Sequence, residues 1–393
     1  MDTLHQPSGP LLGVKVIDLS SVVMGPYTSQ ILGDMGADVL KIESTDGDVF
    51  RYTAPSKHPT MSASFIQLNR NKQSIALNLK NAEEKAKLLE LISSADVLLY
   101  NIRPRSMIKL GLDYASLQVI NPRLIYCGVY GFSEDGPYSG KPAYDDLIQA
   151  MSGLADLQGR NKTEYRPEYL NTVIADKVTG ITAAYAIAMA LYEREKSGLG
   201  QAVDVPMFET MVSFNLMEHM AEATFTDNPK PNMGYGRVLS KSRKPHQTKD
   251  GYLGILPYTS AQWERFFTLS GLEHHAKEER FINPALRGQN IDEMYSILSE
   301  TMMTKSTEEW IALLKDADIP MARVNTVESL LEDEHLKHIG FFKTYQHPTE
   351  GNIRLTDIPT KFSRTPGTIF RLPPNLNQDA GLVNLKKKCE KAS

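Results

Sequence analysis

The stretch SIALNLKNAEEKAKLLELISSADVLLY, residues 74–100, contains two apolar segments separated by an amphipathic one. The apolar runs Ser74–Leu79 and Val97–Tyr100 predict strands. Asn81–Ser94 predicts a helix between them, because an asparagine stands first as an N-cap, a glutamate follows three positions later as in a capping box, and leucines and an isoleucine form one stripe. A strand, a helix and a strand in this order indicate parallel strands joined by a right-handed crossover.

The same alternation continues on both sides of this stretch. Further strands are predicted at Val14–Leu19, Ala37–Ile42 and Leu124–Val129, so the N-terminal part of the chain indicates an α/β domain with a mainly parallel sheet. A long helix is predicted from Asp176 to Glu195, and Gly198 is placed to end it.

A second, smaller domain is predicted downstream. Residues 225–247 are punctuated by Pro, Gly and basic residues, as in an inter-domain passage. A strand-like GYLGILPYT follows, and helices are predicted at Ala261–Leu272, Ile291–Met303 and Thr307–Ala317. We therefore expect a large domain at 1–224, an α+β domain at 225–325 and a loop-rich C-terminal segment at 326–393.

The composition is that of a globular protein. The 393 residues are 41% hydrophobic and 23% charged, and the formal net charge of −4 argues against a general nucleic-acid binder. The N-terminus lacks the basic start and apolar run of a signal peptide, and the apolar segment Ile181–Leu191 is too short to cross a bilayer. We therefore expect a cytoplasmic protein that binds neither nucleic acid nor membrane.

Common cofactor and metal motifs are missing from the sequence. No G-x-G-x-x-G follows the first strand, and neither a P-loop, a G-x-S-x-G elbow nor an H-E-x-x-H motif occurs. The two cysteines have no partner spacing, so no disulfide or zinc site is expected. Cys127 lies in an apolar run and is expected in the core, whereas Cys389 lies in the Lys-rich tail and is expected to be exposed.

Asp176, in the segment YLNTVIADKVTG, admits two interpretations. Aspartate is a favoured N-cap residue, and a long helix begins here. Alternatively, a carboxylate nucleophile lies near the helix amides, and the positive end of the helix dipole keeps it ionised at neutral pH. Both interpretations place the residue at the same end of the helix.

Three polar segments are also candidates for ligand binding. Asn69–Lys72 precedes a strand and is either a solvated loop or a segment that binds phosphate or shapes the edge of a cleft. Asn101–Arg105 follows the strand Val97–Tyr100 and is either an exposed loop or a site for a phosphorylated ligand, since ligands of parallel sheets bind beyond the carboxyl ends of strands. Ala143–Asp146 places two acids and a phenol at a helix start, where they are also consistent with a cap.

Taken in order, the motifs resemble those of the class III CoA-transferase family. The resembling blocks are GVKVIDLSSVVMGPY, GADVLKIES with GDVFR, NRNKQSIALNLK, ADVLLYNIRP, LGLDY, NPRLIYCGVYGFSEDGPY, YDDLIQAMSGL, DIPMARVNTVESL and HPTEGNIRLTDIPTKFSRTP. The resemblance runs from about residue 10 to about residue 375. It implies a Rossmann-like large domain, a smaller domain, a C-terminal segment that returns to the large domain, and an interlocked homodimer.

The resemblance also implies the chemistry. The family's nucleophilic aspartate falls on Asp176, which would attack the thioester of an acyl-CoA donor, form a mixed anhydride and an aspartyl-CoA thioester, and pass CoA to a carboxylic acid. CoA is then a substrate, and no permanently bound cofactor or metal is expected. The positions that match the family's CoA contacts are Val23, Met24, Leu77, Lys80, Asn101, Ile102, Arg103, Lys109, Ala143, Tyr144 and Asp145. Asp145 matches an acid that contacts the nucleophile in relatives.

The sequence departs from the family pattern at three places. Ser44 replaces a common basic residue, Pro104-Arg105 replaces a Pro-Gly, and the region Lys241–Asp250 has no Gly run. The last departure argues against oxalate and formate as substrates.

Two alternatives stay open. A 2-methylacyl-CoA racemase needs two acid/base groups, but Tyr144 stands where its relatives have a histidine. The other alternative is a CoA-binding protein without catalysis.

Overall fold

The computed structural model describes residues 1–162 and 164–382, which form two compact units. Of the described residues, the first unit contains Met1–Ser152, Leu170–Phe214 and 334–382, and the second contains those within Gly153–Tyr169 and Asn215–Asp333. These boundaries differ from the predicted ones, because Gly153–Tyr169 and residues 215–224 belong to the second unit and the C-terminal segment begins at residue 334. Local sequence patterns do not report such long-range packing. Cys389 lies outside the described residues.

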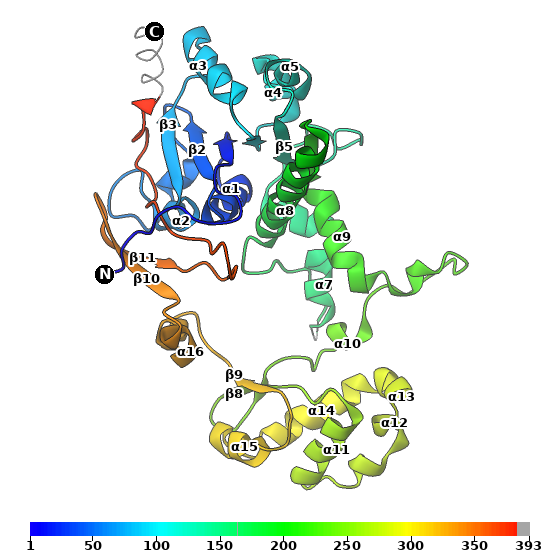
Figure 1. The fold of residues 1–393 in the computed structure, drawn as a ribbon. Coiled ribbons are helices and arrows are strands. Elements are labelled where there is room, and N and C mark those ends of the chain that lie inside the picture. Colours follow the sequence, from blue (N-terminus) through cyan, green and yellow to red (C-terminus); the bar gives the residue numbers. More distant parts are fainter. Residues whose placement is uncertain (163, 383–393) are drawn as a thin grey trace. The chain divides into compact units, whose positions relative to one another are not determined.

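The first unit is built on a six-stranded parallel sheet with the order β3-β2-β1-β4-β5-β6 (Figure 1). Ile17 pairs with Leu40 on one side and with Leu98 on the other. This confirms the predicted parallel sheet, and the order reverses between β1 and β4 as in doubly wound folds. The strands are β1 Lys15–Asp18, β2 Asp38–Glu43, β3 Lys72–Ala76, β4 Val97–Tyr100, β5 Ile125–Tyr130 and β6 Ala202–Pro206.

Helices cover both faces of this sheet. On one face, α3 (Ala82–Ser93), α4 (Pro104–Leu110) and α5 (Tyr114–Ile120) bury leucines, isoleucines and a methionine against β1–β5. On the other, α1 (Met24–Asp34) packs against α8 (Ile174–Ser197), and α8 packs against β5 and β6. The shorter elements of this unit are η1 Val49–Tyr52, α2 Ala63–Leu68 and α6 Asp145–Met151, and α9 Met207–His219 begins in it.

Helix ends follow the local sequence signals. Asn81 accepts hydrogen bonds from the N–H groups of Glu83 and Glu84 and caps α3, although Glu84 itself bonds to the N–H of Asn78, so the capping box is not reciprocal. Gly198 ends α8 with φ of +79°. Cys127 is fully buried, as predicted.

Helix α8 is longer than the apolar segment seen in the sequence. Its 24 residues are long and apolar enough to span a membrane by length and composition, and half of its most apolar window is buried inside the protein. Because α8 packs on α1, β5 and β6, its position is that of a core helix in an α/β layer.

The C-terminal segment contains a hairpin that the prediction of a loop-rich tail missed. After α16 (Glu334–His338), β10 Phe342–His347 and β11 Gly351–Thr356 pair in antiparallel register and pack with Phe65 and Ile66 of α2. The chain then runs beside β3, where Asp379 accepts a hydrogen bond from the N–H of Ser74 and donates one to its carbonyl.

The second unit contains a three-stranded antiparallel sheet, β7-β8-β9, and a helical core. Trp263, Phe266, Met294, Leu298 and Trp310 are buried together in it. The three predicted helices occur within a few residues of their expected bounds. Its elements are α7 Leu154–Arg160, η2 Ala221–Thr224, α10 Gly236–Leu239, β7 His246–Gln247, β8 Tyr252–Ile255, α11 Ser260–Leu269, η3 His275–Lys277, α12 Glu279–Ile282, α13 Pro284–Gln289, α14 Ile291–Met302, α15 Thr307–Leu314, β9 Met321–Arg323 and η4 Ser329–Glu332.

Candidate active site

A cavity of about 250 Å³ lies in the first unit at the carboxyl edge of the sheet. Its walls come from the segments that follow β1, β4, β5 and β6, so it sits where the strand order reverses between β1 and β4. In open α/β sheets this crevice is the usual place for a ligand. The lining residues are Ser21, Val22, Val23, Met24, Asn101, Arg103, Tyr130, Gly131, Lys141, Pro142, Ala143, Tyr144, Asp145, Asp176 and Met207.

Asp176 enters this cavity from the first turn of α8. The helix begins at Ile174, and its N-cap residue is Val173, which makes no side-chain cap. The interpretation of Asp176 as the N-cap is therefore wrong, because the helix starts two residues earlier than predicted. Its carboxyl group is instead part of the cavity wall.

The protonation of Asp176 also differs from the expectation. Burial, and secondarily the negative charge of Asp145, raise the pKa of Asp176 to about 7. The helix dipole was expected to keep this carboxylate ionised, but loss of solvent and a like charge outweigh it. A carboxyl group that titrates near neutrality inside a cleft is typical of functional sites.

Asp145 is the direct partner of this turn of α8. Its Oδ1 accepts a hydrogen bond of 3.0 Å from the backbone N–H of Asp176, and its Oδ2 accepts one of 2.6 Å from Nε2 of Gln149. Gln149 also bonds to the carbonyl of Thr172 and the N–H of Leu170. Asp145, which is 6% exposed, therefore ties α6 to the segment that carries Asp176.

Comparison with known proteins decides the family. The sequence model of CoA-transferase family III matches residues 11–380. The chain belongs to CoA-transferase family III. The match covers almost the whole chain, including every residue that lines the cavity.

Similar proteins are found among characterised transferases and solved structures. An acyl-CoA transferase of Fusarium pseudograminearum is 33% identical over 91% of this chain and 77% of its own length. Human succinyl-CoA:glutarate CoA-transferase is 30% identical over 94% of this chain and 84% of its own. The crystal structure of a CAIB/BAIF family protein from Brucella suis, 31% identical, superposes with a TM-score of 0.81 and covers 96% of this chain and 99% of its own.

Ten of the eleven residues predicted for CoA binding in this family III chain line one of two cavities. Seven of them line the cavity that contains Asp176: Val23, Met24, Asn101, Arg103, Ala143, Tyr144 and Asp145. Leu77, Lys80 and Ile102 line a second cavity of about 460 Å³ that also includes Ser44. Ser21 lines both cavities. Lys109 lines neither and is exposed near the end of α4.

The segment Asn69–Lys72 is neither a solvated loop nor a ligand-binding edge. Arg70 pairs with Asp34 at 2.7 Å, and Lys72 lies 3.6 Å from Asp18. All four residues of the segment are buried. Burial lowers the pKa of Lys72 to about 7, although Asp18 opposes this shift. The segment therefore holds the sheet to α1, and its partners lie too far away in the sequence for a local pattern to indicate them.

Other cavity residues had no sequence signal of their own. Tyr130, the last residue of β5, and Met207, which directly follows β6, line the cavity, and Lys141 is a second basic residue in its lining besides Arg103. Gln149 is not among the lining residues but donates to Asp145 from four positions further along α6, and that spacing is a signal that sequence reasoning could have used. Among residues 1–162 and 164–382, no cluster of three or more His, Cys, Asp or Glu side chains is arranged to hold a metal ion.

Proposed function

We propose that this family III protein transfers CoA from an acyl-CoA donor to a carboxylic acid, with Asp176 as the nucleophile. The observation that carries the proposal is the carboxyl group of Asp176 in the cavity at the sheet's switch point, with a pKa of about 7. A carboxylate that is poorly solvated and close to neutral pKa is both available and reactive at physiological pH.

The reaction begins at the thioester of the donor. A carboxylate oxygen of Asp176 attacks the thioester carbonyl, the carbon–sulfur bond breaks, and CoA leaves as a thiolate, so that a mixed anhydride remains on the enzyme. The thiolate then attacks the Asp176 carbonyl and releases the donor acid as its carboxylate. The product of this half-reaction is an aspartyl-CoA thioester.

The second half-reaction repeats these steps with the acceptor. Its carboxylate attacks the aspartyl thioester, CoA thiolate leaves, and a second mixed anhydride forms. The thiolate attacks the acceptor's carbonyl and frees the Asp176 carboxylate and the new acyl-CoA. Each step passes through a tetrahedral oxyanion, for which backbone N–H groups at the start of α8 are the proposed donors. Water must be excluded, since either anhydride would hydrolyse.

We propose that CoA spans both cavities. Leu77, Lys80 and Ile102 would contact the outer part of CoA, with Lys109 at the surface beyond them. Val23, Met24 and Ala143 would guide the thioester towards Asp176. Continuity at Ser21, which lines both cavities, supports this path. Succinyl-CoA as donor and a short dicarboxylic acid as acceptor are proposed because the human relative is a succinyl-CoA:glutarate CoA-transferase, and Arg103 and Lys141 supply positive charge in the cavity.

We also propose a homodimer. Ile181, Tyr185, Met189 and Tyr192 follow one another at helical spacing on α8 and are 49–66% exposed. An apolar stripe of this kind on one protomer is typical of a surface that a second copy covers. The interlocked arrangement rests on the family resemblance alone.

The racemase alternative is not favoured. The relatives are CoA-transferases, and no histidine stands among the residues that line the Asp176 cavity. Incubation of one enantiomer of a 2-methylacyl-CoA in deuterated buffer separates the two functions. Exchange of the α-proton at a rate matching or exceeding CoA transfer would favour the racemase.

Asp176→Ala tests the proposal directly. We expect loss of CoA transfer from a panel of acyl-CoA donors to carboxylic acids, read by mass spectrometry of new thioesters, with the fold intact by circular dichroism. Normal turnover in this variant would refute the mechanism. CoA binding without transfer in the unmodified protein, with every acid in the panel, would instead support a non-catalytic CoA-binding protein.

A further inference from the structure

The segment between β1 and α1 contains a strained residue. Val22 has φ of +71°. A β-branched residue adopts this left-handed conformation only at a cost of about 1–3 kcal/mol. Val22 lines the Asp176 cavity, and Ser21 lines both cavities. Contacts around the segment must therefore impose its conformation.

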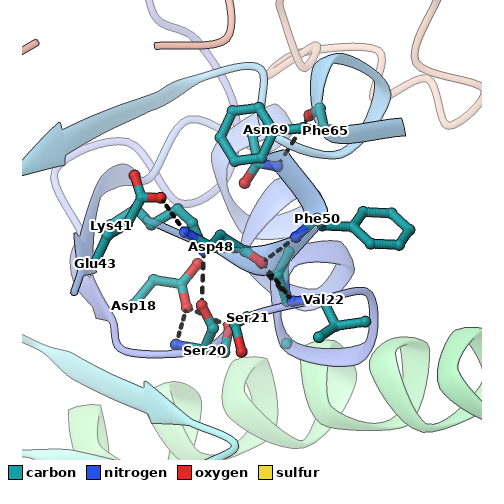
Figure 2. Close-up of polar contacts among 12 residues, drawn as sticks. Asp18, Ser20, Ser21, Val22, Lys41, Glu43, Asp48, Phe50, Phe65 and Asn69 are labelled. Atoms are coloured by element: carbon teal, nitrogen blue, oxygen red, sulfur yellow. Dashed lines mark hydrogen bonds and ion pairs between the residues drawn. The ribbon is translucent and has the colours of Figure 1, made fainter. Parts of the chain in front are cut away.

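Asp48, in the segment after β2, makes the decisive contact. The N–H of Val22 donates to both carboxylate oxygens of Asp48, at 3.0 and 3.3 Å, and Asp48 is 3% exposed. Figure 2 shows this carboxylate between the N–H groups of Val22 and Phe50 and the ammonium group of Lys41. Asp48 therefore binds the strained peptide group of Val22 at its N–H.

Two further groups hold the residues before Val22. The ammonium group of Lys41, 3.0 Å from Asp48, donates to the carbonyl of Ser20 at 2.7 Å. The side-chain amide of Asn101 pairs with the backbone of Ser21, accepting from its N–H at 3.1 Å and donating to its carbonyl at 2.8 Å. Three consecutive residues are thus fixed by three buried or half-buried side chains.

The start of α1 is fitted to the same segment and to α8. A Cβ atom on Gly25 would lie 2.2 Å from Cβ of Ser20, so only glycine allows this approach. The hydroxyl of Thr28 donates to the carbonyl of Gly180 at 3.0 Å, one turn after Asp176 on α8. The conformation of Ser20–Val23 is therefore coupled to the position of the helix that carries Asp176.

We propose that Asp48 is a positioning residue for the reaction at Asp176. Through the N–H of Val22 it holds the left-handed conformation, and this conformation keeps the cavity wall formed by Ser21–Met24 in place against the reacting acyl group. The inference rests on the proposed function. Without the carboxylate, Val22 relaxes to negative φ and the wall moves away from the acyl group. The part of the second cavity formed by Leu77, Lys80 and Ile102, where we place the outer part of CoA, keeps its shape, although Asp48 also lines that cavity.

The test is a double-mutant cycle between Asp48→Asn and Val22→Gly. Glycine adopts positive φ without strain, so a loop with Val22→Gly depends less on Asp48. We expect Asp48→Asn alone to slow single-turnover acyl transfer to Asp176 by about 10–100-fold, which corresponds to the strain energy released when Val22 relaxes. The Kd of CoA should change less than ~3-fold. We expect the loss caused by Asp48→Asn to be at least ~5-fold smaller when Val22→Gly is also present.

Asp34→Asn is the matched control. It removes another buried acid from an ion pair, with Arg70, but does not contact Ser20–Val23. We expect it to lower thermal stability without slowing transfer. If Asp48→Asn does not fold, Asn101→Ala takes its place, because Asn101 is only half-buried. If Asn101→Ala slows transfer because a direct contact with CoA is lost, Val22→Gly does not restore the rate. If it slows transfer because the segment Ser20–Val23 moves, Val22→Gly restores it.

Two results would overturn the inference. One is that Asp48→Asn slows acyl transfer equally with and without Val22→Gly, and the other is that it does not slow transfer at all. The same criteria apply to Asn101→Ala if Asp48→Asn does not fold. A crystal structure of the same variant gives a readout that does not depend on activity: φ of Val22 should become negative, and a retained positive φ would also overturn it. If the unmodified protein transfers no CoA to any acid, the proposed function fails, and this structure alone then decides whether Asp48 holds the loop.

Discussion

Asp176→Asn should stabilise the protein increasingly as the pH rises. The folded-state pKa of Asp176, about 7, lies above its ordinary value of 3.8. The folded protein therefore binds a proton more tightly than the unfolded chain, and this contribution to stability is lost as the pH rises from about 4 to about 7. At about 1.36 kcal/mol per unit, the difference of about 3 units amounts to about 4 kcal/mol when both states are ionised.

The pH-dependent part of this difference is the measurable quantity. Between pH 5 and pH 8, the free energy of unfolding of Asp176→Asn relative to the unmodified protein should increase by about 2–3 kcal/mol and then level off. Asparagine keeps the shape of aspartate and does not titrate, so its own burial adds only a constant. The assay is urea unfolding at pH 5, 6, 7 and 8, followed by circular dichroism and tryptophan fluorescence.

Asp113→Asn is the control for this experiment. Hydrogen bonds from Ser116 lower the pKa of Asp113, which caps α5, so it stays ionised throughout this pH range in both states. Its variant should show a difference in stability that does not vary between pH 5 and pH 8. A constant difference for Asp176→Asn as well, or one that shrinks with rising pH, would refute the assignment of a near-neutral pKa to Asp176.

Three further results are expected. Asp145→Asn removes the like charge and lowers the pKa of Asp176, so the rise of kcat/KM with pH should move to lower pH. An unchanged pH profile would show that burial alone raises the pKa of Asp176. Lys72→Met leaves Asp18 with less compensation and should lower the free energy of unfolding by about 3 kcal/mol in denaturant titrations, whereas an unchanged midpoint would make the pair energetically neutral. Met189→Glu places a charge in the exposed stripe of α8 and should lower the melting temperature of the dimer by several degrees in differential scanning fluorimetry, and an unchanged melting temperature would place the interface elsewhere.

Local sequence signals predicted many elements of the fold. Asn81 and Gly198 act at the ends of helices through backbone groups within a few residues, so their roles follow from sequence alone. The parallel sheet follows from strand–helix–strand alternation. The hairpin β10–β11 was missed because the Pro residues spread through the tail indicated loops, although none of them lies within either strand.

The electrostatics of the site needed the structure. The raised pKa of Asp176 depends on burial and on Asp145, a residue from another helix. The polar run Asn69–Lys72 was taken for a surface segment because its partners Asp34 and Asp18 are brought to it only by the sheet and α1. Val22 gives no sequence signal at all, since valine is not a residue expected at positive φ.

Covalent trapping shows whether Asp176 is the nucleophile. The protein is incubated with succinyl-CoA and hydroxylamine, digested and sequenced by mass spectrometry. We expect a hydroxamate on Asp176 that depends on the acyl-CoA and is absent from Asp176→Asn. Turnover of CoA to an acceptor acid with no modification at Asp176, or with the hydroxamate on another carboxylate, would contradict it.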